Sequence, residues 1–132
     1  MKLVCDTNVL VAALVADGLC RDIVKRRLPR MALYTSRELL DELDSVLRVK
    51  FRADLATLPF LRMYRERVIL VEPVQLKKRV CRDPDDDVVL GTAKAAGADA
   101  ILTGDEDLLV LRSFEGIAIV PPRAFVESLD RT

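Results

Sequence analysis

The sequence predicts an α/β fold, in which a parallel β-sheet lies between helices on both of its faces. Short apolar runs of strand length alternate along the chain with longer segments whose apolar residues recur at helical spacing. Strands that alternate with helices in short steps form βαβ units, and these units build parallel sheets. The 132 residues suffice for one core, and no repeat or Gly/Ser-rich linker divides them, so we expect a single domain over residues 1–132.

The short apolar runs predict where the strands of this sheet lie: Lys2–Cys5, Met31–Tyr34, Val68–Val71, Ala100–Leu102 and Ile117–Val120. The segments between and after them predict the helices: Val9–Ala16, Arg21–Arg27, Arg37–Val49, Asp54–Arg65, Asp85–Ala96 and Arg123–Leu129. In parallel sheets, ligands bind at the carboxyl ends of the strands, near the point where the strand order reverses. Polar residues that directly follow a predicted strand are therefore candidate site residues.

The composition excludes several classes of enzyme. The chain has no histidine, which rules out Ser-His-Asp and Cys-His nucleophile systems, His-ligated zinc and imidazole bases. Its three cysteines, Cys5, Cys20 and Cys81, are odd in number and too sparse for a disulfide framework. Any chemistry must therefore rest on carboxylates, hydroxyls, lysines or bound ions.

The beginning of the chain predicts neither a membrane span nor a secretory signal. The apolar stretch Val9–Ala16 is far shorter than the roughly 20 residues that cross a bilayer. Asp6 interrupts the segment that could otherwise serve as a signal peptide. Because unpaired cysteines persist in reducing compartments, we expect a cytoplasmic protein.

The charges balance but are segregated along the chain. Lys plus Arg and Asp plus Glu both number 21, so the net charge is zero. Residues 45–82 carry ten basic and three acidic side chains, whereas residues 83–132 carry four basic and eleven acidic ones. The basic residues can simply solubilise exposed helix faces. Alternatively, they form a basic surface beside an acidic pocket, which would suit a phosphodiester substrate.

Two candidate carboxylates occur in the first half of the chain. Asp6 directly follows the first predicted strand, where it can either cap the next helix or project into a ligand site. Glu42 lies on the predicted helix Arg37–Val49, about 100° around the helix from Leu43 at the centre of the apolar stripe. That border position allows Glu42 either to reach a pocket or to extend into solvent.

The run Asp83-Pro84-Asp85-Asp86-Asp87 is the richest in carboxylates. Its composition is that of a helix start, with an N-cap, a proline at the first helical position and acids that the helix dipole favours. The helical phase separates its members, since Asp86 shares the apolar face of Val89 and Leu90 whereas Asp87 points away from that face. A carboxylate aimed at the interior should be paired, protonated or bound to a metal, so Asp86 is the candidate of this run.

Two further acids, Asp105 and Asp107, follow the predicted strand Ala100–Leu102. Together with Gly104 they can form a turn in which Asp105 caps a short helix, but they also stand at the carboxyl end of a strand. Acids gathered in a low-dielectric cleft repel one another unless cations neutralise them. Without histidine, an all-oxygen ligand set predicts a hard ion, Mg²⁺ or Mn²⁺.

Taken in order, these residues resemble the motifs of PIN-domain nucleases. No single motif is specific, but four in this order at these separations are, and they cover nearly the whole chain. The chain is similar to small prokaryotic PIN proteins, which include toxin components of VapBC-type toxin–antitoxin systems. The segments that carry the resemblance are Asp6-Thr7-Asn8-Val9-Leu10, Glu42-Leu43, Asp83-Pro84-Asp85-Asp86 and Thr103-Gly104-Asp105-Glu106-Asp107-Leu108-Leu109.

The resemblance implies a PIN-like, Rossmann-like three-layer α/β/α sandwich with a parallel sheet of about five strands. It also implies metal-dependent hydrolysis of RNA, with an antitoxin protein and a second copy of the chain, in a homodimer, as further partners. The implied catalytic acids are Asp6, Glu42, Asp86 and Asp105, of which the first, third and fourth would bind Mg²⁺ or Mn²⁺. Auxiliary polar positions of the family pattern fall on Thr7, Asn8, Thr103 and Asp107.

The alternative from another functional class is a PIN-like module that binds RNA or an antitoxin without cleaving RNA.

Two other α/β families also place an Asp after the first strand. A haloacid-dehalogenase-like phosphatase needs a second Asp two residues later, where this chain has Asn8. A response-regulator receiver needs an acceptor Asp after a middle strand and a Lys after a late one, and Tyr34-Thr35-Ser36 and Pro121-Pro122 supply neither.

Overall fold

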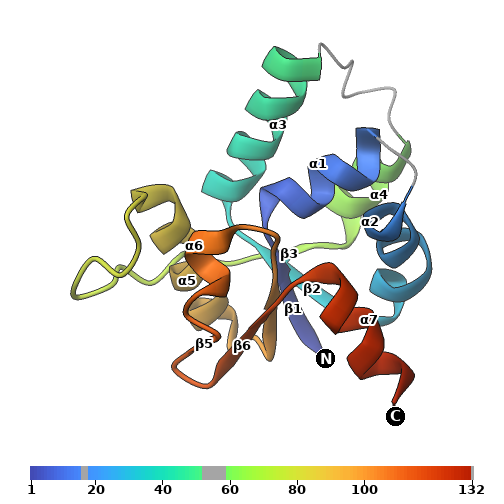
Figure 1. Ribbon diagram of the computed structural model, residues 1–132. Coiled ribbons are helices and arrows are strands. Elements are labelled where there is room, and N and C mark those ends of the chain that lie inside the picture. The colour runs from blue at the N-terminus through green and yellow to red at the C-terminus, as the bar shows by residue number, and fades with distance from the viewer. Residues whose placement is uncertain (16–17, 52–58, 132) are drawn as a thin grey trace.

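A six-stranded β-sheet forms the centre of the protein (Figure 1). The computed structural model describes residues 1–15, 18–51 and 59–131. The strands are β1 (Lys2–Cys5), β2 (Ala32–Thr35), β3 (Ile69–Leu70), β4 (Ala100–Leu102), β5 (Ser113–Phe114) and β6 (Ile117–Val120). The helices are α1 (Thr7–Val15), α2 (Leu19–Asp22), η1 (Ile23–Arg27), η2 (Leu28–Arg30), α3 (Arg37–Phe51), α4 (Pro59–Arg67), α5 (Pro84–Ala96), α6 (Glu106–Leu109) and α7 (Pro122–Asp130).

The strand order, β3-β2-β1-β4-β6-β5, reverses direction at β1. The chain adds β2 and β3 on one side of β1 and then returns to place β4 on the other side. Both neighbours of β1 run parallel to it, with Val4 opposite Tyr34 on β2 and opposite Ile101 on β4. The carboxyl ends of β1 and β4 therefore form the switch point, where ligands bind in sheets of this type.

The mostly parallel sheet confirms the predicted α/β class, with one added strand. Five strands pair in parallel, whereas β5 pairs antiparallel with β6. The two-residue turn between them consists of Glu115 and Gly116, both at positive φ (48° and 83°), as a type I′ hairpin requires. This short hairpin extends the edge of the sheet beyond the five predicted strands.

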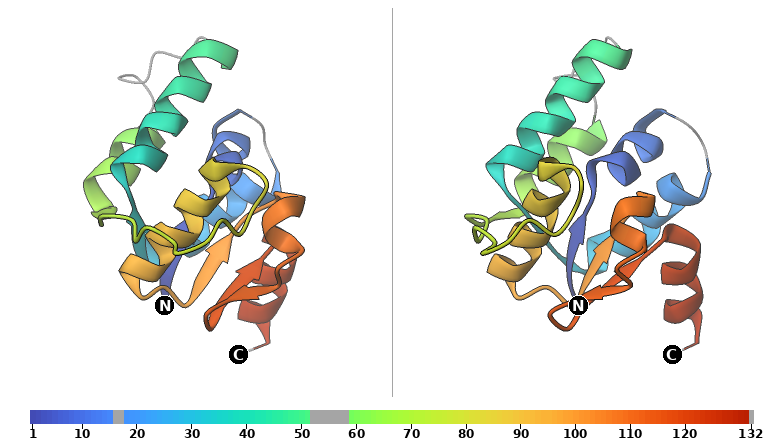
Figure 2. Two further views of the ribbon diagram at one scale, coloured as in Figure 1. Left: turned by 90° about the vertical axis from the view of Figure 1, so that its left-hand side faces the viewer. Right: turned by 60° about the vertical axis from the view of Figure 1, so that its left-hand side comes forward.

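Helices cover both faces of the sheet. Strand side chains alternate between the faces, so Leu3 and Cys5 of β1 join a core with α1, η1, α4 and α7. Val4 and Ile101 point the other way, into a second core with α5 and α6. Figure 2 shows α5 on the opposite side of the sheet from α1 and α2. The protein is thus layered as helices, sheet and helices.

Helix α3 rises from the carboxyl edge of the sheet beside α1 (Figure 1). Its apolar stripe joins both cores, since Leu39 packs in the α5 core whereas Leu43 and Leu47 pack in the α1 core. The predicted amphipathic phase of this helix is confirmed: these three leucines are buried and Glu42, at the border of the stripe, is half-buried. Glu42 is thereby brought to the same edge as the ends of β1 and β4.

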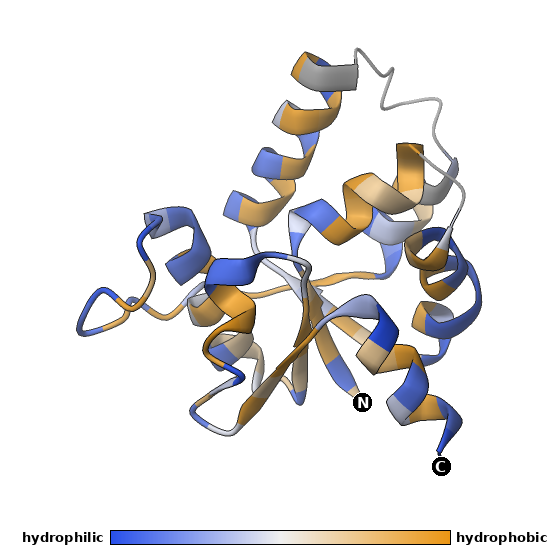
Figure 3. Cartoon of the chain, viewed as in Figure 1, coloured by the Kyte–Doolittle hydropathy of each residue, from blue (hydrophilic) through white to orange (hydrophobic). Residues whose placement is uncertain are grey.

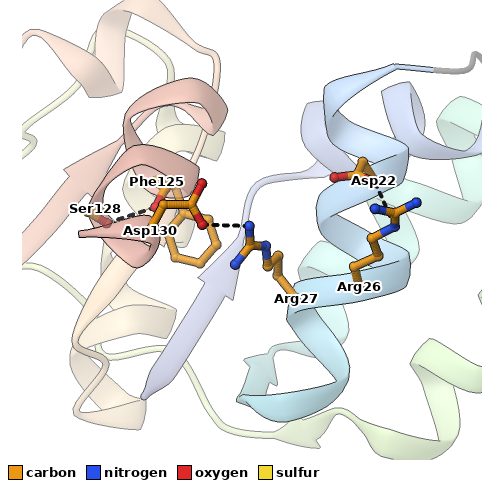
Figure 4. Close-up of polar contacts among 6 residues, drawn as sticks. All are labelled: Asp22, Arg26, Arg27, Phe125, Ser128 and Asp130. Carbon is orange, nitrogen blue, oxygen red and sulfur yellow. Dashed lines mark hydrogen bonds and ion pairs between the residues drawn. The ribbon is translucent and has the colours of Figure 1, made fainter. Parts of the chain in front are cut away.

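Helix α7 and the π-helical turn η1 are joined on the α1 side of the sheet (Figure 4). Arg27 forms an ion pair with Asp130 at 2.7 Å, and Phe125 of the same helix, α7, is buried. One turn earlier, Arg26 pairs with Asp22 at 3.1 Å. These ion pairs lie on the surface of the α1 layer, and neither Asp22 nor Asp130 is one of the candidate site residues.

Most predicted elements are confirmed with small shifts at their ends. α1 begins before the predicted Val9 because Asp6 already occupies the N-cap position, where its carbonyl accepts the Val9 N–H at 3.1 Å. The strand predicted at Met31–Tyr34 is β2, displaced by one residue, because the Met31 N–H closes the preceding turn on Leu28. α3, α5 and α7 each exceed the predicted helix by one or two residues.

Three predicted elements differ more. The single helix predicted over Arg21–Arg27 falls on the end of α2 and on the π-helical η1, and the 3₁₀ turn η2, which contains Pro29, follows directly. The strand predicted over Val68–Val71 pairs only as β3, because the Val68 N–H still bonds to α4. The helix predicted over Asp54–Arg65 is α4, and residues 54–58 of that prediction, like residue 16 of another, lie outside the described residues.

Across the described ranges, no helix is both long and apolar enough to cross a lipid bilayer.

Candidate active site

The site begins where β1 and β4 end side by side. Asp6 follows β1, and its N–H bonds to the carbonyl of Leu102 at 2.9 Å. Thr103 follows β4 and is fully buried, and its hydroxyl donates to Asp6 Oδ2 at 2.7 Å. The same hydroxyl accepts the N–H of Asp105 at 3.0 Å. Thr103 thus joins the acid of one strand to the acid that follows the next strand.

Three carboxylates gather beside this link. Asp86, Asp105 and Asp107 each offer one oxygen, and these oxygens all lie within 4.8 Å of one another. Asp86 comes from the first turn of α5, whereas Asp105 and Asp107 lie at the start of α6. Figure 3 shows the hydrophilic starts of α5 and α6 at the same end of the sheet as the start of α1. We call Asp86, Asp105 and Asp107 the acidic cluster.

Asp83 and Asp105, which the sequence offers as helix N-caps, cap α5 and α6. Asp83 accepts the N–H of Asp85 at 2.9 Å and begins α5. Asp105 accepts the N–H of Asp107 at 2.9 Å through Oδ1 and begins α6. Asp105 therefore caps α6 and also belongs to the acidic cluster, so the two roles considered for it from the sequence do not exclude each other.

Glu42 reaches the same edge from α3. Its Oε2 accepts the hydroxyl of Thr7 at 3.2 Å, and Thr7 directly follows Asp6. A small cavity of about 70 Å³ lies beside it, lined by Glu38, Leu39, Glu42, Asp85 and Val88. The side chain of Asn8 is exposed on the first turn of α1, and the described residues give it no hydrogen bond to these acids.

Burial, followed by the charges of neighbouring acids, raises the pKa values of three carboxyl groups at this site. Burial, followed by the charge and hydrogen bond of Asp105, raises the pKa of Asp86 to about 7, and Asp6 and Asp83 add to the effect. Burial also raises the pKa of Asp6 and of Glu42, against the opposing hydrogen bonds from Thr103 and Thr7. The site therefore has an excess of negative charge that a cation would neutralise.

One arginine contacts the acidic cluster, and sequence reasoning did not single it out. Arg82 donates to Asp107 Oδ1 at 2.6 Å. In the sequence it is only one of ten basic residues in the stretch 45–82, although it directly precedes the capping Asp83. Asp87, predicted to point away from the apolar face of its helix, accepts the backbone N–H groups of Val80 and Cys81.

The residues present fit a hard divalent cation. The donors are three carboxylate oxygens from two segments, the first turn of α5 and the start of α6, and the chain has no histidine to favour a softer metal. The cluster as found contains Asp107, predicted only as an auxiliary residue. Asp6 stands beside it, near enough to Asp86 and Asp105 for the charges to interact.

Comparison with protein families matches residues 2–107 to the PIN domain. The chain belongs to the PIN domain family. The structure of this PIN domain is also similar to a chain of the crystal structure of VapBC2 from Rickettsia felis bound to a DNA fragment from their promoter. The two share 13% sequence identity with a TM-score of 0.63, covering 92% of this chain and 98% of that chain, so the likeness concerns the fold. No curated protein matches the sequence.

Proposed function

We propose that this PIN domain is a divalent-metal-dependent endoribonuclease and the toxin of a toxin–antitoxin pair. The observation that carries the proposal is the acidic cluster, which lies at the switch point of the sheet beside Asp6, while Glu42 bonds to the adjacent Thr7. Gathered carboxylates of this kind, of which Asp107 forms an ion pair with Arg82, cost stability, so a fold that retains them is expected to use them. Family membership, with the likeness to the R. felis VapBC2 structure, supports a nuclease of the toxin type.

The proposed roles follow from position. Asp6, Asp86 and Asp105 hold Mg²⁺ or Mn²⁺, and Asp107 completes the ligand set. When bound, the cation neutralises the phosphate and lowers the pKa of water. Thr103 fixes Asp6 by its hydrogen bond, as Thr7 fixes Glu42.

Glu42 orients the attacking water and accepts its proton, since its raised pKa makes it a better base than an exposed glutamate. In-line attack of this water forms a new bond to the phosphorus and breaks the bond to the 3′-oxygen, which takes a proton from solvent, leaving a 5′-phosphate and a 3′-hydroxyl.

We propose single-stranded or structured RNA as the substrate, an antitoxin protein and a second copy of the chain as partners, and the cytoplasm as the compartment. The excess of basic residues over positions 45–82 supports an anionic polymer as the substrate. The three cysteines are free, which supports a reducing compartment.

The test is cleavage of labelled RNA with Mg²⁺ or Mn²⁺, beside DNA of the same sequence and beside reactions with EDTA. We expect wild type to cleave RNA only with metal and to leave 5′-phosphate ends. Asp6→Asn should abolish cleavage while the protein remains folded, and Asp22→Asn, which removes an acid of the α1 layer, should cleave as wild type does. RNA binding without cleavage under all these conditions, or normal cleavage by Asp6→Asn, would overturn the proposal; the former favours the binding module.

A further inference from the structure

Arg82 places a guanidinium at the rim of the acidic cluster. Its terminal nitrogen lies 2.6 Å from Asp107 Oδ1, and 87% of its side chain is exposed. Asp107 in turn shares the 4.8 Å cluster with Asp86 and Asp105. A solvent-exposed cation thus stands next to the carboxylates that a phosphodiester must approach.

The backbone that carries Arg82 is held firmly. The side chain of Cys81 is buried, and the carboxylate of Asp87 accepts the N–H groups of Val80 at 3.1 Å and Cys81 at 2.8 Å. From the other side, Arg79 donates to the carbonyl of Cys81 at 3.1 Å and to that of Arg82. The loop is therefore fixed by contacts that do not involve the Arg82 guanidinium, which extends from it into solvent.

The ion pair of the Arg82 guanidinium contributes little to the stability of the fold. Exposed ion pairs contribute little to stability, because solvent screens them and long side chains lose entropy. One bond to Asp107 also uses only part of its donors, since arginine presents five N–H groups in a fork that matches the oxygens of phosphate. A cation held by the cluster would share the charge of Asp107 and weaken its hold on Arg82.

We propose that Arg82 binds a phosphate of the RNA strand beside the scissile bond, an inference that rests on the nuclease function proposed above. Asp107 is the resting partner of the guanidinium, and the substrate phosphate replaces it. Because Arg82 would contact the substrate directly, its effect should appear in RNA binding and in the salt dependence of that binding.

The experiment measures binding of a fluorescent single-stranded RNA oligonucleotide to Asp6→Asn protein in Mg²⁺, by anisotropy at several KCl concentrations. The added change Arg82→Ala should weaken binding about tenfold or more at low salt, as expected for a lost hydrogen bond between charged groups. It should also make the slope of log K against log[salt] shallower by about 0.7, the value for one phosphate contact on a single strand. Arg82→Lys should keep the slope and lose part of the affinity.

The matched control is Arg26→Ala. Arg26 is also exposed, at 78% of its side chain, and is also paired with an aspartate, but it lies on the η1 surface shown in Figure 4. It should change neither affinity nor slope. A slope for Arg82→Ala equal to that of this control would overturn the proposal.

A second arm separates direct contact from positioning. If Arg82 acts only by holding Asp107, then Arg82→Ala has no effect in an Asp107→Asn background; if it contacts phosphate, the loss of affinity and slope persists there. An effect confined to protein with Asp107 intact would overturn the inference. If wild type cleaves RNA and Arg82→Ala matches its control, only this inference fails, whereas a wild type that neither binds nor cleaves RNA overturns both proposals.

Discussion

Replacing Thr103 by valine tests the link between the two strand ends. The change keeps the shape of the side chain and removes a fully buried hydroxyl that donates to Asp6 at 2.7 Å and accepts from Asp105 at 3.0 Å. A hydrogen bond to a charged group contributes about 1.5–3 kcal/mol, and an unpaired buried N–H costs about 1–3 kcal/mol. Since Asp105 is half-exposed and water can reach it, we expect Thr103→Val to lower the free energy of unfolding by about 2–4 kcal/mol.

Urea unfolding followed by circular dichroism at pH 8 in EDTA measures this loss. With a urea dependence of about 1–3 kcal/mol per molar, the midpoint should fall by about 1–2 M. Thr103→Ser is the matched control, because it keeps the hydroxyl and loses one methyl group, which costs about 1 kcal/mol. Equal midpoints for the valine and serine variants would refute the hydrogen-bonded link.

The effect of Thr103→Val should also depend on pH in one direction. Burial raises the pKa of Asp6 and the bond from Thr103 lowers it, so without that bond the pKa is higher still. The penalty is complete above the pKa of Asp6 in the variant, where the carboxylate is charged in both proteins. The part that comes from the charge of Asp6 disappears below the pKa in wild type, where Asp6 is neutral in both proteins, whereas the part that comes from the Asp105 N–H remains. The difference between the proteins should therefore shrink as the pH falls from 8 to 4, and a difference that grows would contradict this account.

Three further results are expected. Asp86→Asn should have a higher melting temperature than wild type at pH 8 in EDTA, and Mg²⁺ should not raise it in a thermal shift assay. The reason is that the pKa of Asp86 is raised from 3.8 to about 7 in the folded protein, so wild type loses stability as the pH rises through that interval. A lower melting temperature of the variant at pH 8 would contradict this reasoning. Gly91→Ala should lower the free energy of unfolding by about 1–3 kcal/mol, measured by urea unfolding, because a Cβ there would lie 2.3 Å from the carbonyl oxygen of Val74; an unchanged urea midpoint would contradict that close approach. Iodoacetamide at pH 7.5 should modify Cys20 before Cys81, whose thiol pKa is raised to about 12 by burial and nearby acids, and mass spectrometry of peptides reports the order.

The directions of several candidate side chains could be predicted because helical periodicity fixes which face of a helix each residue occupies. The phase of the helix after Pro84 predicted that Asp86 faces inward and Asp87 outward, and Asp86 is 9% exposed while Asp87 binds the preceding loop. The angle of Glu42 around its helix likewise predicted that it lies at the border of the apolar stripe, and its side chain is half-buried there. The strands could be predicted where both faces are buried, as in β1 and β4.

The rest depends on contacts between distant segments, which periodicity does not encode. Arg82 has an exposed, flexible side chain, and it meets Asp107, 25 residues later, only because the loop before α5 packs beside α6. Asp107 joins the cluster because the cap at Asp105 sets the first turn of α6. β5 and the π-helical η1 are too short to show a period, and tertiary packing determines both.

The central claim is that acids from separate segments hold one divalent cation. Binding of Mn²⁺ followed by electron paramagnetic resonance, with Mg²⁺ as competitor, tests it without any RNA. We expect wild type to bind Mn²⁺ saturably and Mg²⁺ to displace the bound Mn²⁺. Asp105→Asn should bind Mn²⁺ at least about tenfold more weakly, as expected for the loss of one charged ligand, whereas Asp22→Asn should bind it as wild type does. Equal affinities for wild type and Asp105→Asn, or no saturable binding to wild type, would contradict the claim.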